Sequence, residues 1–176
     1  VKSVLDSTSA GVGNLIAEGD EKRIISVFWE LNSLRYFIAG ILTFAVYNLI
    51  GSFVLLWLGE EYILSNSVLT IILCNLFIMQ TRGTVDQFTY GYGLFSDIWA
   101  PIAESAISLL VAFSAGAYFG LEGVLMGSVV SMALIIGIWK PYFLFHKGFK
   151  RKVSEYWKEI FKYVLCVALS WIASTL

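Results

Sequence analysis

The chain has 176 residues, of which 58% are hydrophobic and only 14% are charged, and its net charge is −1. A soluble domain carries about 25% charged residues, and about a third of the surface of its unfolded chain stays in contact with water after folding. The composition therefore excludes a soluble globular domain, and we expect no nucleic-acid partner. It predicts an all-α fold, a polytopic bundle of transmembrane helices.

The first residues of the chain give a prediction about its extent. The chain starts with Val1 rather than Met, and residues 1–20 lack the order of basic, apolar and small residues that makes a secretory signal peptide. This stretch has instead the character of the second half of a helix. We expect the chain to be the C-terminal part of a larger protein, beginning inside a truncated span.

Runs without charged residues locate the membrane spans. A span needs about 20 mostly apolar residues, each of which adds about 1.5 Å along the helix axis. We expect about five full spans after the end of the truncated helix. The expected spans cover residues 1–17 (truncated), 36–58, 67–90, 98–119, 123–145 and 160–176.

Residues between the spans have the chemistry of helix ends. Ser65 or Asn66 can cap the second full span by accepting a backbone N–H, and Gly91 and Gly93 interrupt the helix at its other end. Asp97 suits the first turn of the following span, because a carboxylate is stabilised at the positive end of the helix dipole.

Small residues recur at helical spacing on the third and fourth full spans. Ala112, Gly116 and Gly120 lie four residues apart, and Gly123 and Gly127 continue this spacing after the turn. Small residues let helix backbones approach closely, so we expect these two spans to form a tight hairpin. The alternative is that glycine is simply common in membrane helices.

The basic residues predict the orientation. The connections 18–23 and 146–158 contain Lys and Arg residues, whereas 59–66 and 120–123 contain none. Basic loops face the cytoplasm, and alternating spans put the loop 91–97 on that same side. We therefore expect the loops 18–23, 91–97 and 146–158 to be cytoplasmic.

An amphipathic segment precedes the last span. Within residues 150–162, apolar side chains fall on one helical face, with Lys and Glu opposite. We expect this segment to lie in the cytoplasmic headgroup layer, where anionic lipid headgroups attract its positive charge. The alternative is a binding site for a partner protein.

A polar stripe runs along the second full span. Its members are Asn75, Met79, Arg82, Asp86 and Tyr90, which share one helical face. If the helix descends from about residue 68, the arginine lies ~21 Å below its start, in the inner third of the bilayer core. Polar groups at that depth normally face a bundle interior or a water-filled cavity.

The charged pair of this stripe has two interpretations. Arg82 and Asp86 are four residues apart, so the arginine can extend to the inner headgroups and pair with the aspartate only for its own stability. Alternatively, Arg82 faces a cavity and attracts an anionic substrate group, with Asp86 orienting it, because the planar guanidinium can hold two phosphate oxygens at once.

Other charged residues are secondary candidates for the same inner vestibule. Arg35 and Glu30 lie at the base of the preceding span, where the alternative is that they anchor the helix at the interface. Asp6, in the truncated helix, and Glu104, near the start of the third full span, are further candidates.

The sequence contains no arrangement typical of an enzyme. The only histidine, His146, lies in a basic loop, and Cys74 and Cys166 lie in apolar runs without metal-ligand spacing. The glycines of the YGYG segment follow no strand, which argues against a nucleotide motif. We expect no enzymatic activity, no cofactor and no metal site.

Five segments together resemble a known family. They are GNLIAEGDEKR (13–23), WLGEEY (57–62), YGYGLF (90–95), GVLMGSVVS (123–131) and WKPYFLFHKGFK (139–150). In this order they resemble the polysaccharide-biosynthesis flippases of bacteria, which move O-antigen and capsule repeat units. These flippases belong to the multidrug/oligosaccharidyl-lipid/polysaccharide exporter superfamily. The motifs are individually short, and the resemblance extends over nearly the whole chain.

The resemblance implies an architecture and a function. It implies a two-lobe transporter around a central cavity, of which this chain is most of one lobe and the missing N-terminal lobe is the partner. It further implies that an undecaprenyl-diphosphate-linked oligosaccharide moves from the inner to the outer leaflet of the bacterial inner membrane by alternating access. No family motif assigns a residue to this substrate, so Arg82, Asp86, Asn75 and Arg35 are expected as binding residues from local reasoning alone.

Other functions fit the same topology. A drug or cation exporter of the superfamily would favour carboxylates and aromatic residues in its cavity over cations. A non-transporting membrane scaffold of a polysaccharide synthase is a second alternative, and an intramembrane glycosyl- or acyltransferase is a third.

Overall fold

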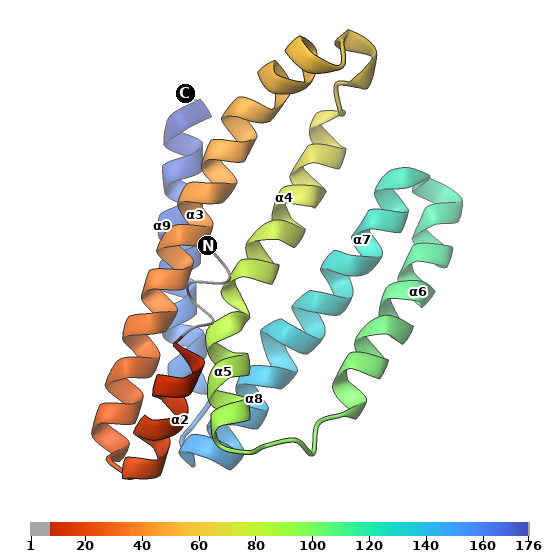
Figure 1. Ribbon diagram of the computed structural model, residues 1–176. Coiled ribbons are helices and arrows are strands. Elements are labelled where there is room, and N and C mark those ends of the chain that lie inside the picture. Colours follow the sequence, from red (N-terminus) through yellow and green to blue (C-terminus); the bar gives the residue numbers. More distant parts are fainter. Residues whose placement is uncertain (1–7, 176) are drawn as a thin grey trace.

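The computed structural model describes residues 8–175, and the side chains of residues 8–170 (Figure 1). This part of the chain is almost entirely helical and contains no strand, which confirms the predicted all-α fold. The elements are α2 (Ser9–Glu18), α3 (Glu21–Trp57), the short 3-10 helix η1 (Glu60–Tyr62), α4 (Asn66–Thr81), α5 (Gly83–Gly91), α6 (Trp99–Phe119), α7 (Leu121–Met132), η2 (Ala133–Trp139), α8 (Lys140–Phe143), η3 (Leu144–Phe149) and α9 (Ser154–Thr175).

Four helical segments of the described chain are long and apolar enough to cross a membrane, which indicates a membrane-embedded protein. They are Glu21–Trp57, Asn66–Gly91, Trp99–Phe119 and Leu121–Phe149. The last span expected from the sequence, 160–176, is not among them. Residues 160–175 form one continuous helix, α9, with most of the amphipathic segment 150–162.

The first full span is longer than the sequence pattern suggests. Helix α3 has 37 residues, or ~55 Å, so the amphipathic stretch before residue 36 continues directly into the span. Asp20 starts this helix, because its side chain accepts hydrogen bonds from the backbone N–H groups of Lys22 and Arg23. Since no proline or glycine occurs between Glu21 and Gly40, nothing in the sequence interrupts the helix at the membrane surface.

The four spans lie in a row, with α3 beside α4, α4 beside α7, and α7 beside α6 (Figure 1). Helix α9 packs along α3, and the short α2 contacts α3 and α5 at the lower end of the view. The connections 19–20, 92–98 and 150–153 meet at that lower end, whereas the connections 58–65 and 120 lie at the upper end. We refer to the lower end, which carries the basic loops, as the inner end and to the upper end as the outer end.

The hairpin of α6 and α7 is tightly packed, as the small residues predict. A Cβ atom at Gly123 would overlap the backbone carbonyl of Ala115, and one at Gly127 would lie 2.5 Å from the Ser108 carbonyl oxygen. Gly120, with φ of 59°, makes the turn between the two helices. Close backbone approach therefore holds the hairpin together.

The apolar core lies at the inner end, where five elements converge. Phe28 of α3 is fully buried, and its ring centroid lies 5.2 Å from that of Phe88, 5.7 Å from that of Phe145 and 5.1 Å from that of Phe149. Val12 of α2 completes this cluster. Rings at these distances and near-perpendicular angles stabilise one another beyond the burial of their surface. The inner ends of α3, α5 and η3 are therefore held in fixed positions beside the charged residues described next.

Candidate charged site

The predicted arginine lies where α4 and α5 join within the second full span. Helix α4 ends at Thr81 and α5 begins at Gly83, with Arg82 between them in a helical conformation. The N–H of Arg82 still donates to the Ile78 carbonyl, and the N–H of Asp86 donates to the Arg82 carbonyl. The span thus keeps its helical course, and Arg82 and Asp86 stay on one face, one turn apart.

Gly83, at the junction of α4 and α5, contacts a second arginine. A Cβ atom at Gly83 would overlap the guanidinium of Arg35, which is almost completely buried between α3 and this junction. The expected candidate Arg35 therefore packs against the backbone of this span, and the Arg35 guanidinium would have to shift to admit a larger residue at position 83.

The predicted pair is the centre of a larger network. Arg82 Nε donates a hydrogen bond of 2.8 Å to Asp86 Oδ2. Arg82 Nη1 lies 4.0 Å from Glu104 Oε1 on α6, so the guanidinium faces carboxylates from two helices. The Arg82 side chain remains 30% exposed, more than that of any other charged residue in this network.

Lys140 extends the network to a third element. It lies where η2 meets α8, and only 5% of its side chain is exposed. Its Nζ is 2.8 Å from Asp97 Oδ2 and 3.7 Å from Asp86 Oδ1. Asp97 Oδ2 has no hydrogen-bond partner that meets the geometric criteria for a hydrogen bond. Its short contact with Lys140 Nζ is therefore described as an ion pair.

The five charges alternate in sign along a line. We call this line the charge ladder, and its members in order are Glu104, Arg82, Asp86, Lys140 and Asp97. Asp86 is its middle member, with one oxygen on each cation. The ladder joins α5, α6 with the connection before it, and α8, and with every group ionised its net charge is −1.

Burial gives the ladder's two ends different properties. Asp97 and Lys140 are almost fully removed from water, so each depends on the other, because an unpaired buried charge destabilises a fold by about 3–5 kcal/mol. Arg82 and Glu104 are more exposed and can exchange partners with less penalty. The ladder thus has a rigid buried end and an accessible end.

Lys140 is a member of the ladder that sequence reasoning did not single out. Asp97, expected in the first turn of the following span, lies just before α6, and its carboxylate pairs with Lys140. Lys140 lies inside the expected span 123–145, and a charge within a span is itself a signal of a functional or paired group. The lysine stood only inside the segment 139–150, outside the basic connection 146–158.

The other expected residues lie outside the ladder. Asn75 is half-buried, and its Nδ2 donates to the Ile71 carbonyl of its own helix. Glu30 is exposed and accepts a hydrogen bond from Ser26. Asp6 lies outside the described residues. Tyr90 of the polar stripe is exposed, and its ring centroid lies 6.0 Å from Lys140 Nζ, which places an aromatic face beside the ladder.

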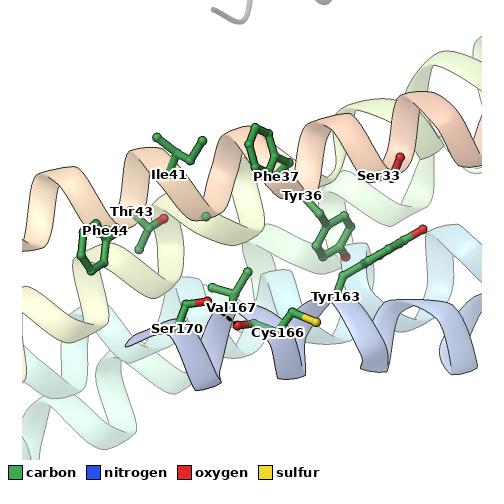
Figure 2. A pocket seen from close by; sticks show the side chains of 11 residues that line it. Ser33, Tyr36, Phe37, Ile41, Thr43, Phe44, Tyr163, Cys166, Val167 and Ser170 are labelled. Atoms are coloured by element: carbon green, nitrogen blue, oxygen red, sulfur yellow. Dashed lines mark hydrogen bonds between the residues drawn. The ribbon is translucent and has the colours of Figure 1, made fainter. Parts of the chain in front are cut away.

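An apolar groove lies between α3 and α9 (Figure 2). It has a volume of about 550 Å³ and no charged residue in its lining. Tyr36 and Tyr163 approach each other across it, with ring centroids 5.5 Å apart, and the buried hydroxyl of Thr43 has no hydrogen-bond partner there. No ladder residue lines this groove, so the apolar groove and the charge ladder are separate sites.

Within the described residues, no group of His, Cys, Asp and Glu could hold a metal ion. Comparison of the chain with protein-family models, curated proteins and solved structures finds no match. Any functional assignment is therefore based on the residues themselves and on the resemblance of their motifs.

Proposed function

We propose that this chain is the C-terminal part of a membrane transporter that moves an undecaprenyl-diphosphate-linked oligosaccharide from the inner to the outer leaflet of a bacterial inner membrane. The observation that carries the proposal is the charge ladder within the spans. Burying an ionisable group inside a membrane protein is energetically unfavourable, and such groups commonly line the path of a substrate or ion. A ladder with one accessible arginine fits a path for an anionic headgroup.

An irregular helical segment beside the ladder supports a transport function. The span that contains Lys140 has π-helical geometry from Ala133 to Trp139, directly before the lysine. Such π-helical segments are frequent at functional sites. This segment lies beside the ladder, because Lys140 pairs with Asp97 and Asp86.

The diphosphate substrate is supported by the chemistry of Arg82 and by the family resemblance. A guanidinium can hold two oxygens of one phosphate group, which a lysine cannot do with the same geometry. The missing lobe would supply the other wall of the cavity.

A bacterial strain that lacks the gene tests this proposal. Accumulation of lipid-linked oligosaccharide on the cytoplasmic side, reversed by the full-length gene, is the expected result. Normal export of the polysaccharide in the deletion strain would contradict the proposal.

A drug or cation exporter is the second candidate, and one observation favours it. The ladder contains three carboxylates against two cations, and the aromatic ring of Tyr90 lies next to it. Cationic compounds are attracted to such a combination. In the same deletion strain, drug hypersensitivity without accumulated oligosaccharide would support the exporter.

A further inference from the structure

We infer that the charge ladder is a latch that closes the inner end of the bundle and opens when a phosphate group takes the place of Asp86 between Arg82 and Lys140. This inference rests on the proposed function and adds how the site responds to its ligand. The starting point is the middle of the ladder. There, one carboxylate satisfies two cations, with Arg82 Nε 2.8 Å from one oxygen and Lys140 Nζ 3.7 Å from the other.

An anionic ligand has a reason to compete for this position. A phosphate group carries more charge than a carboxylate and has more oxygens to accept charge-assisted hydrogen bonds from a guanidinium and an ammonium. The closed ladder, with a net charge of −1, does not attract anions by itself. The exchange therefore requires Asp86 to turn away as the phosphate arrives, so that closure and binding exclude each other.

The exchange would release ionic contacts at the start of α6, which also packs there through Trp99 against Trp139, with ring centroids 4.7 Å apart. The salt bridges of Glu104 with Arg82 and of Asp97 with Lys140 connect the start of α6 to α5 and α8. Along its length, α6 packs mainly against α7, with which it forms the small-residue hairpin. Gly93, with φ of 65°, lies in the connection between α5 and α6, where a glycine tolerates a change of backbone direction.

A fully buried alanine can report the opening. Ala100 lies in the first turn of α6, three residues after Asp97, and Ala39 lies on α3, away from the ladder. Each would be replaced by cysteine in the full-length protein, with Cys74 and Cys166 changed to alanine. The rate of labelling with a membrane-impermeant maleimide is then measured in inside-out vesicles.

The ladder variants are D97N and K140Q, and R151Q is the matched control. Arg151 forms an exposed ion pair with Glu155 at the same end of the bundle, at 3.6 Å, outside the ladder. We expect D97N and K140Q to raise labelling at position 100 at least tenfold, to leave position 39 unchanged, and R151Q to change neither. Unchanged labelling at position 100 would overturn the latch, and an equal rise at both positions would show general loosening and overturn it as well.

Pyrophosphate is the probe for the ligand. We expect it to raise labelling at position 100 in the protein with an intact ladder and to have no effect in R82Q. If pyrophosphate has no effect on the intact ladder, the exchange mechanism is wrong. A pyrophosphate response in a protein that moves no lipid-linked oligosaccharide would keep the latch and remove the proposed substrate, so the two failures can be told apart.

Discussion

The inner and outer ends of the bundle are held together by different interactions. At the inner end, aromatic rings around Phe28 pack against one another, and the charge ladder joins three elements. Toward the outer end, α6 and α7 meet through Gly123 and Gly127, while large side chains such as Leu56 and Phe113 point outward and are exposed. The outer end therefore depends on backbone proximity, and the inner end depends on specific side chains.

In the proposed latch, the change of shape takes place at the inner end. Close backbone packing has few alternative arrangements, because each glycine contact fails when the helices move apart. Ion pairs can exchange partners when a ligand supplies equivalent charge. A molecule built this way can open at the inner end while the hairpin moves as one unit.

The largest expected effect comes from the buried end of the ladder. K140M leaves the Asp97 carboxylate buried without its cation, and the free energy of unfolding should fall by about 3–5 kcal/mol. The exposed Lys162, which pairs with Glu159, gives the control K162M, for which little change is expected. Unfolding of the purified full-length protein in detergent measures both. Equal stability of the two variants would show that the Lys140 ion pair is not a structural requirement.

The hairpin should respond next. In G127A the added methyl group meets the Ser108 carbonyl oxygen and the side chain of Ala112, so α6 and α7 must move apart, with a loss of about 1–3 kcal/mol. Gly51 on α3 has open space where a Cβ would be, so G51A is the matched control. The same unfolding measurement applies. A G127A protein as stable as G51A would remove the evidence for close packing as the basis of the outer end.

A smaller effect is expected at Gly83, where α4 and α5 join. In G83A the added methyl group meets the end of the Arg35 side chain, which can shift only slightly because it is buried, and we expect a loss of about 1 kcal/mol. Gly13 of α2 has open space and provides the control G13A. If G83A gains stability as an ordinary helical Gly→Ala change does, Arg35 does not limit the size of the residue at position 83.

The smallest effect should come from the surface of the inner end. R151Q removes an ion pair whose side chains are about half exposed, and such pairs contribute only about 0.2–1 kcal/mol. Unfolding at low and high salt measures the contribution, which should decrease as salt screens it. A loss as large as that of K140M would show that burial does not separate the two kinds of ion pair.

The sequence contains enough information for most of the helices and for three of the five ladder members, Arg82, Asp86 and Glu104. Charge-free runs mark the spans, and the four-residue spacing of Arg82 and Asp86 places them on one face. The pairing of Asp97 with Lys140 could not be read in this way, because 42 residues of intervening chain separate them and only the packing of α8 beside the start of α6 brings them together. Local helix chemistry predicted only that Asp97 lies near the start of a helix, and it lies just before α6.

The course of α3 was also underestimated for a physical reason. The charged residues before position 36 end the apolar run, but they do not end the helix, since backbone hydrogen bonding continues as long as no residue breaks it. Hydropathy locates the membrane, whereas glycine, proline and caps locate helix ends.

The central claim is that Arg82 acts on an anionic substrate inside the bundle. The most direct measurement is the amount of lipid-linked oligosaccharide in each leaflet in cells that produce R82Q at the wild-type level. R23Q is the control, because Arg23 forms an exposed ion pair with Glu18 at the same end of the bundle. We predict that the oligosaccharide accumulates in the inner leaflet with R82Q and not with R23Q. Equal transport by R82Q and the wild-type protein would contradict the account.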